Sequence, residues 1–154
     1  NHEYYWNSRE WSDYISSLGI KVLNNENVQL THNDSPFYLA GVTDISSTKY
    51  DQKNPYDPAK AIEGIPVNAY KILMSHQPKT CFLTSKLKYD VQLSGHTHGG
   101  QGFPWNFIVY LVQPYIKGLH KVEDMYLYVS SGTGFWGPPN RFMVNSEITE
   151  ITFG

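Results

Sequence analysis

The stretch YDVQLSGHTHGG, residues 89–100, is an apolar run that ends in a loop carrying two histidines. Residues 89–93 predict a buried strand. In extended backbone His96 and His98 point to the same side, about 6.6–6.8 Å apart. That separation fits two metal ions about 3.5–4 Å apart, or one shared ion if the rings converge. The alternative is a pair of ordinary loop histidines, but the flanking glycines, which let the backbone turn sharply, favour metal binding.

A second apolar run, Tyr70–Met74, also ends in a loop with a histidine, His76 in the sequence SHQP. A helix is predicted between the two runs, around residues 82–87. Open sheets place ligand sites at the carboxyl ends of their strands, so the two histidine loops are expected to meet. A lone histidine after a strand is more often a hydrogen-bonded loop residue than a ligand. Its place at the same sheet edge as His96 and His98 reverses that preference.

The remaining elements are predicted from periodicity and from start and stop signals. An amphipathic helix over residues 8–18 ends at Gly19, and a short helix begins at Asp57-Pro58. Residues 99–117, rich in glycine, proline and aromatic side chains, are expected to be irregular. Met125–Val129 and residues 146–153 are expected to be closing strands. The sequence therefore predicts a single domain of the α/β (or α+β) class.

Composition excludes several kinds of protein. The chain has 154 residues, of which 40% are hydrophobic and 17% charged, as in a globular domain rather than a disordered segment. A net charge of −2 lacks the basic footprint of nucleic-acid binding, so no nucleic-acid partner is expected. Cys81 is the single cysteine, which excludes an intramolecular disulfide. A zinc protease would need an H-E-x-x-H helix, which the sequence lacks.

Three short motifs occur in order along the chain: Asn1-His2-Glu3, then His76 after a strand, then Gly95-His96-Thr97-His98. They resemble the last three motifs of calcineurin-like metallophosphoesterases, whose full pattern is D-x-H, G-D, G-N-H-[D/E], H and G-H-x-H. Within this family, the chain looks like transmembrane proteins with a metallophosphoesterase domain and their bacterial relatives. The matching segments are residues 1–5, 41–44, 75–78, 93–101, 111–119 and 128–141.

The resemblance implies a fold and a set of roles. The fold would be the C-terminal part of a β-sandwich of two mixed sheets flanked by helices. Asn1, His76 and His96 would bind one divalent ion, and His98 would bind a second. His2 would stay off the metals and act as the general acid. The cofactors implied are two ions, of which Mn, Fe and Zn are the candidates, and the activity implied is hydrolysis of a phosphomonoester or phosphodiester.

Asp44 and Arg141 lie in matching segments, which makes them candidates for contacts with substrate or with groups behind the ligands. The D-x-H and G-D motifs are absent from the chain. Two dications held by imidazoles and an amide would be almost uncompensated in charge, and Glu3 and Asp44 are the only carboxylates available to help. We therefore expect an incomplete domain, inactive or nearly so by itself, with a central strand that exposes an unpaired edge.

Substrate and partners follow only in outline from the resemblance. A phosphoester is implied, a lipid-linked one is an option, and membrane contact would come through helices upstream of this chain. The aromatic residues at 103–115 either pack the domain, which is the commoner outcome, or form a lip over a greasy phosphodiester. The competing interpretation of the whole chain is a non-catalytic module that keeps the fold and binds a protein partner.

Overall fold

The computed structural model describes residues 1–152, and in them it contains one mixed sheet with six strands in the order β1-β2-β3-β4-β6-β5. The strands are β1 (Glu26–His32), β2 (Ser35–Gly41), β3 (Tyr70–Met74), β4 (Val91–Ser94), β5 (Gly118–Val122) and β6 (Met125–Val129). The four central strands, β2, β3, β4 and β6, are mutually parallel, and β1 and β5 close the sheet as antiparallel edges. The predicted α/β class is confirmed.

Short helices connect these strands. They are α1 (Ser8–Ser17), α2 (Ser47–Tyr50), α3 (Pro58–Ala61), α4 (Cys81–Thr84) and α5 (Trp105–Val112), with 3-10 turns η1 (His2–Tyr5), η2 (Pro78–Thr80), η3 (Ser85–Leu87) and η4 (His98–Gly100). The predicted helix starts are confirmed, because the Asn7 side chain caps α1 and Asp57 caps α3 through its own carboxylate. The helix predicted around residues 82–87 is formed by α4 and η3 together.

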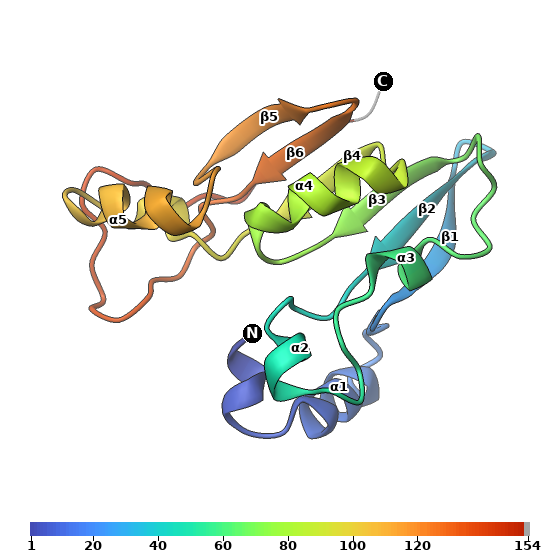
Figure 1. Cartoon of the computed structure of the whole chain (residues 1–154), viewed down its shortest axis with the longest axis horizontal. Coiled ribbons are helices and arrows are strands. Elements are labelled where there is room, and N and C mark those ends of the chain that lie inside the picture. Colours follow the sequence, from blue (N-terminus) through green and yellow to red (C-terminus); the bar gives the residue numbers. More distant parts are fainter. Residues whose placement is uncertain (153–154) are drawn as a thin grey trace.

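The core lies on the face of the sheet that α3 and α4 cover (Figure 1). Alternation along β6 shows the two faces: Met125, Leu127 and Val129 are fully buried, whereas Tyr126 and Tyr128 between them point the other way. Ala40, Leu73 and Cys81 are among the residues that complete the buried cluster. One face of the sheet is therefore packed in the ordinary way.

The opposite face of the sheet is open. A groove of about 1140 Å³ crosses it, lined by residues that include Tyr70, Ile72, Val91 and Tyr126. The expectation that a central strand would expose an unpaired edge is wrong, because β3 and β4 each have hydrogen-bonded neighbours on both sides. What residues 1–152 leave uncovered is an apolar face, and they contain one of the two sheets that the resemblance implies.

Two other expectations are wrong. Residues 99–117 are not irregular throughout, since Trp105–Val112 forms α5; the exposed face of this helix is apolar, which hid the helical period from the sequence. Residues 146–152 form no strand in the structure, and Phe153 lies outside the described residues. The segment is held instead through Glu147, whose carboxylate accepts hydrogen bonds from Tyr128 Oη and the Ser131 N–H. Side-chain contacts thus replace the expected strand pairing.

The open face should make the chain bind hydrophobic dyes and self-associate. Replacing Leu119 and Tyr126, which are exposed on that face, with serine should lower the fluorescence of bound anilinonaphthalene sulfonate and shift size-exclusion elution toward the monomer. Leu18→Ser is the matched control, because Leu18 is also exposed but lies at the end of α1. Equal effects of the two changes would show that the open face has no special role.

Candidate metal site

The ends of β3 and β4 bring two of the predicted ligands together. Ile72, Leu73 and Met74 pair in parallel register with Val91, Gln92 and Leu93, so the two strands end at the same level. The Gly95 N–H then donates to the His76 carbonyl at 3.0 Å. As a result, the rings of His76 and His96 lie edge to face, with centroids 5.0 Å apart. Sheet topology thus joins residues that are twenty positions apart.

The loop after β4 is a tight turn and does not continue the extended backbone of the strand. His96 has φ 69° and His98 has φ 49°, so both lie in the left-handed region that non-glycine residues avoid. The extended spacing expected for the two histidines is therefore wrong. Thr97 anchors the turn by donating from Oγ1 to the Ile116 carbonyl at 2.6 Å. Strain of this kind costs about 1–3 kcal/mol per residue and concentrates at functional sites.

A buried polar network supports the two loops from below. Gln92 Nε2 donates to Thr80 Oγ1 at 3.0 Å and to Ser94 Oγ at 2.9 Å, while its Oε1 accepts from Thr84 Oγ1. Ser94 Oγ in turn donates to the Ser75 carbonyl at 2.6 Å. Our sequence analysis missed Gln92, although a glutamine inside an apolar strand is a detectable signal. Satisfied networks of this kind hold neighbouring groups in one arrangement.

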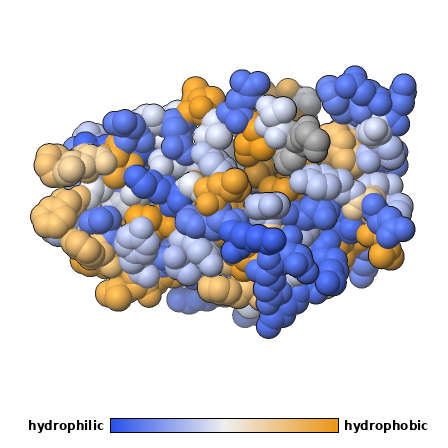
Figure 2. All heavy atoms as spheres, turned by 90° about the horizontal axis from the view of Figure 1, so that it is seen from above, coloured by the Kyte–Doolittle hydropathy of each residue, from blue (hydrophilic) through white to orange (hydrophobic). Residues whose placement is uncertain are grey.

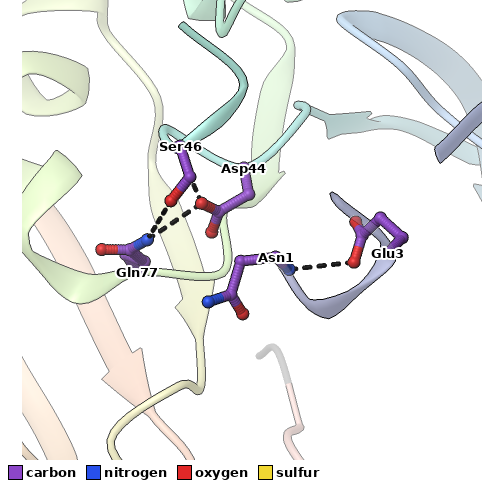
Figure 3. Close-up of polar contacts among 5 residues, drawn as sticks. All are labelled: Asn1, Glu3, Asp44, Ser46 and Gln77. Carbon is purple, nitrogen blue, oxygen red and sulfur yellow. Dashed lines mark hydrogen bonds and ion pairs between the residues drawn. The ribbon is translucent and has the colours of Figure 1, made fainter. Parts of the chain in front are cut away.

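Asp44 is the buried carboxylate nearest to this site, with 5% of its surface exposed. Its Oδ1 accepts from the Ser46 N–H at 2.8 Å and from Gln77 Nε2 at 2.9 Å (Figure 3). Its Oδ2 is buried and has no hydrogen-bond partner among the described residues. Burial raises the pKa of Asp44, but the hydrogen bonds from Ser46 outweigh it, so the pKa is lowered. An ionised, unpaired oxygen is suited to a cation.

Asn1 and His2 lie on the same side of the molecule as the histidine loops. In Figure 3 the amide group of Asn1 points away from the Asp44 carboxylate, and the terminal ammonium pairs with Glu3 Oε2 at 3.0 Å. His2 is exposed, packs against Tyr5 with ring centroids 6.0 Å apart, and contributes to the electrostatic field at His98. His76 and His96 are therefore the predicted site residues that the structure places in direct contact.

The environment keeps the loop histidines neutral. His76 retains an exposed flank, yet desolvation by the surrounding loops, together with the terminal ammonium and His96, lowers its pKa to about 4. Desolvation also lowers the pKa of His96. For His98, desolvation and the charges of Arg141 and His2 lower the pKa against the effect of a hydrogen bond to the Gly134 backbone. A neutral imidazole is the form that binds a metal ion.

Arg141 organises the loop that covers His98. Its Nε donates to the Gly134 carbonyl at 2.8 Å, its Nη1 donates to the Asn145 carbonyl at 3.0 Å, and its Nη2 bonds to the carbonyls of Ser131 and Gly134. All these hydrogen bonds of the guanidinium go to backbone carbonyls. They agree with the second of the two expected roles of Arg141, a contact with groups behind the ligands, rather than with a contact to substrate. Gly134 is also the residue whose backbone bonds to His98. Arg141 therefore acts behind the site.

The same loop requires glycine at position 99. Gly99 has φ 63°, and a Cβ there would lie 2.6 Å from Val144 Cγ1 and 2.8 Å from Ser131 Oγ. Neither distance is tolerable for a Cβ, because the 131–145 loop packs directly on the backbone between His98 and Gly100. Only glycine fits at this position. The glycines of the motif thus serve loop packing as well as turning.

The residues present fit part of a metal site. His76, His96 and the unpaired Asp44 oxygen offer the nitrogen and oxygen donors that Zn, Fe or Mn accept. Within residues 1–152, however, no three histidine, cysteine, aspartate or glutamate side chains are placed to hold an ion together. The described residues thus present neighbouring donor groups without a complete metal cluster.

Replacing Arg141 with lysine should lower the free energy of unfolding by about 1–3 kcal/mol, because a compact ammonium does not reproduce the planar fork with which the guanidinium reaches three separate carbonyls. Urea titration followed by circular dichroism measures the change. Arg9→Lys on exposed α1 is the control and should stay within about 0.5 kcal/mol of the parent chain. An unchanged free energy of unfolding in Arg141→Lys would mean that the 131–145 loop keeps its conformation without the guanidinium.

Comparison with known proteins agrees with this arrangement. The chain is 41% identical, over 96% of its length, to an uncharacterised metallophosphoesterase of Campylobacter jejuni, and covers 39% of that protein. It is 37% identical over 98% of its length to a bovine transmembrane protein with a metallophosphoesterase domain, covering 36% of it. An uncharacterised metallophosphoesterase of Aquifex aeolicus is 30% identical over 99% of the chain, which covers 58% of that relative.

No family model matches the chain, and no solved structure matches it significantly. The chain spans about two fifths of the length of the bacterial and bovine relatives named first. Identity nevertheless extends over nearly all of the chain in proteins from distant organisms, all named for the same activity. The α/β sheet and the histidine loops at its edge thus belong to a chain that is similar, over nearly its whole length, to proteins named as metallophosphoesterases.

Proposed function

We propose that the intact protein hydrolyses a phosphomonoester or phosphodiester with water activated by two divalent metal ions, and that this chain supplies about half of the catalytic site. The contact of His76 with His96, 5.0 Å between ring centroids, carries the proposal. The buried and unpaired Asp44 Oδ2 supports it. The names of the relatives support the class of reaction.

The proposed division of roles follows the motifs. Asn1, His76 and His96 hold one ion, and His98 holds the other. Ions of this kind lower the pKa of a bound water and offset charge on the phosphoryl oxygens. The neutral histidines need lose no proton to bind, and the strained loop holds the His96 and His98 rings in fixed directions. Asp44 contributes negative charge from behind Asn1 and His76.

His2 is the proposed general acid. It is exposed and belongs to the η1 turn rather than to the histidine loops. It lies close enough to His98 to affect the pKa of that histidine. A histidine in that position can donate a proton to the departing oxygen of the ester. Such assistance is worth typically ~10²–10⁴-fold in rate.

The chain by itself is proposed to be inactive or nearly so. Two dications need more negative charge than Asp44 and Glu3 provide, and residues 1–152 form no complete metal cluster. In the family pattern the missing carboxylates come from D-x-H and G-D motifs, which would lie upstream of Asn1.

The intact protein is further proposed to be membrane-associated. The support is the bovine relative, named as a transmembrane protein. In the described part of this chain, no helix is long and apolar enough to cross a membrane. A phosphoester carried by a lipid is the substrate that this location favours.

The half-site should bind one divalent ion weakly. Titration of the chain with Co²⁺ should produce visible absorption bands, and His96→Ala should abolish them, because one of the adjacent imidazoles is lost. His32→Ala is the matched control, since His32 lies on the β1–β2 hairpin at the far end of the strands, and should leave the spectrum unchanged. Bands that persist in His96→Ala would remove His96 from the ligands.

Hydrolysis is tested in the intact protein. It should cleave bis-p-nitrophenyl phosphate or p-nitrophenyl phosphate after loading with Mn²⁺, and His2→Asn should lower kcat by about 10²–10⁴-fold. That variant should still show the Co²⁺ absorption bands, which separates proton transfer from metal binding. A loaded protein that hydrolyses neither compound would instead favour the non-catalytic binding module.

A further inference from the structure

The candidate metal site is bordered by an apolar surface, here called the apolar lip. It consists of α5, Phe103 before it, and two pairs of residues from the 131–145 loop, Phe135-Trp136 and Phe142-Met143. Its exposed members are Phe103, Trp105, Phe107, Ile108, Tyr110, Leu111, Val112, Phe135, Trp136, Phe142 and Met143. Figure 2 shows apolar side chains gathered at the left-hand end of the molecule, where α5 lies in Figure 1.

Most of the surface of α5 is exposed to solvent. Asn106 and Val109 are half-buried and Gln113 is buried, so this one stripe at helical spacing packs against the fold. The remaining residues of α5 face away from it, and Leu111 is 87% exposed. Contiguous exposed apolar patches of this kind mark interaction surfaces.

The lip is fixed to the histidine loop by Gln101, three residues after His98. Its Nε2 donates to the Trp136 carbonyl at 2.6 Å, and its Oε1 accepts from the Trp136 N–H. The Trp105 and Trp136 rings stack, with centroids 6.1 Å apart and 20° between their planes. Whatever the lip binds is therefore held beside His98.

The charge around the lip selects among partners. The sequence contains no aspartate or glutamate between Asp90 and Glu123, and none between Asp124 and Glu147. The basic residues in these two segments are Lys117, Lys121 and Arg141, of which the two lysines are exposed. Lys117 follows α5 closely and Arg141 lies in the 131–145 loop, so the segments that form the lip carry basic residues and no carboxylate, which complements an anionic lipid surface.

We propose that the apolar lip docks the protein on an anionic lipid bilayer, with α5 lying in the headgroup region. Tryptophan and tyrosine rings are suited to that region, because one part of each ring system is apolar and another forms hydrogen bonds. The histidine loop then faces the plane in which lipid phosphates lie. This surface attachment is separate from any membrane-spanning segment and does not depend on hydrolytic activity.

The open face of the sheet is a different kind of surface. Its side chains stand in rows across paired strands, as in Leu119 beside Tyr128 and Tyr70 beside Phe37, which is the arrangement that another layer of protein covers. The lip instead combines a short helix with two loop segments that carry no ladder of strands. The two surfaces can therefore be tested against each other.

Co-sedimentation of this chain with vesicles of phosphatidylcholine, with and without phosphatidylglycerol, tests the proposal. The chain should bind the anionic vesicles, and the double variant Phe107→Ser/Leu111→Ser should bind at least about tenfold more weakly, because two exposed apolar side chains are lost. Leu119→Ser/Tyr126→Ser, on the open sheet face, is the matched control and should retain binding. Added salt should weaken binding in both.

A second measurement guards against misfolding of the double variant. In a Trp6→Phe/Trp11→Phe background, lipids brominated on the acyl chains should quench Trp105 and Trp136, and the single change Leu111→Gln should reduce the quenching. Absence of quenching, or vesicle binding lost through the sheet-face variant instead of the lip variant, would overturn the proposal. Neither result bears on the Co²⁺ or hydrolysis tests, since no metal or substrate is present.

Discussion

The parallel register of β3 and β4 is the constraint on which the rest of the site depends. Both strands end at one level, so His76 and His96 leave the sheet side by side. Gln92 supports that register, because its amide satisfies the hydroxyl groups of Thr80, Thr84 and Ser94, and Ser94 in turn donates to the Ser75 carbonyl after β3. In a buried setting an unsatisfied member would cost about 1–3 kcal/mol, which makes the paired arrangement much the most stable one.

A second line of polar contacts connects the other parts of the site to this strand pair. Gln77, the residue after His76, holds Asp44 through Nε2 and accepts from Gln113 at 3.3 Å. Asp44 follows β2, and Gln113 follows α5. The carboxylate, the histidines and the base of the apolar lip are thus parts of one hydrogen-bonded assembly, so a displacement of one is transmitted to the others.

The chain leaves two apolar surfaces uncovered, and they have different physical characters. The open sheet face is ordered by strand pairing and requires another layer of protein, as expected of a chain that spans about two fifths of its relatives. The apolar lip lies beyond the strand ends, beside the histidine loop, with basic residues and no carboxylates in its segments. The first surface is suited to packing against another layer of protein, and the second to the proposed docking on a lipid bilayer.

Short-range patterns in the sequence determined the α/β class, the strands of the two histidine loops, the helix start at Asp57 and the resemblance to the family, since each depends on neighbouring residues or on motif order. They did not determine α5, whose exposed face is apolar, or the partner of residues 146–152, which is made by side chains. The sequence offered Asp44 and Arg141 as candidates, and only the tertiary structure decided which groups they and Gln77 contact. Their roles depend on contacts between segments distant in the chain, and only folding creates such contacts.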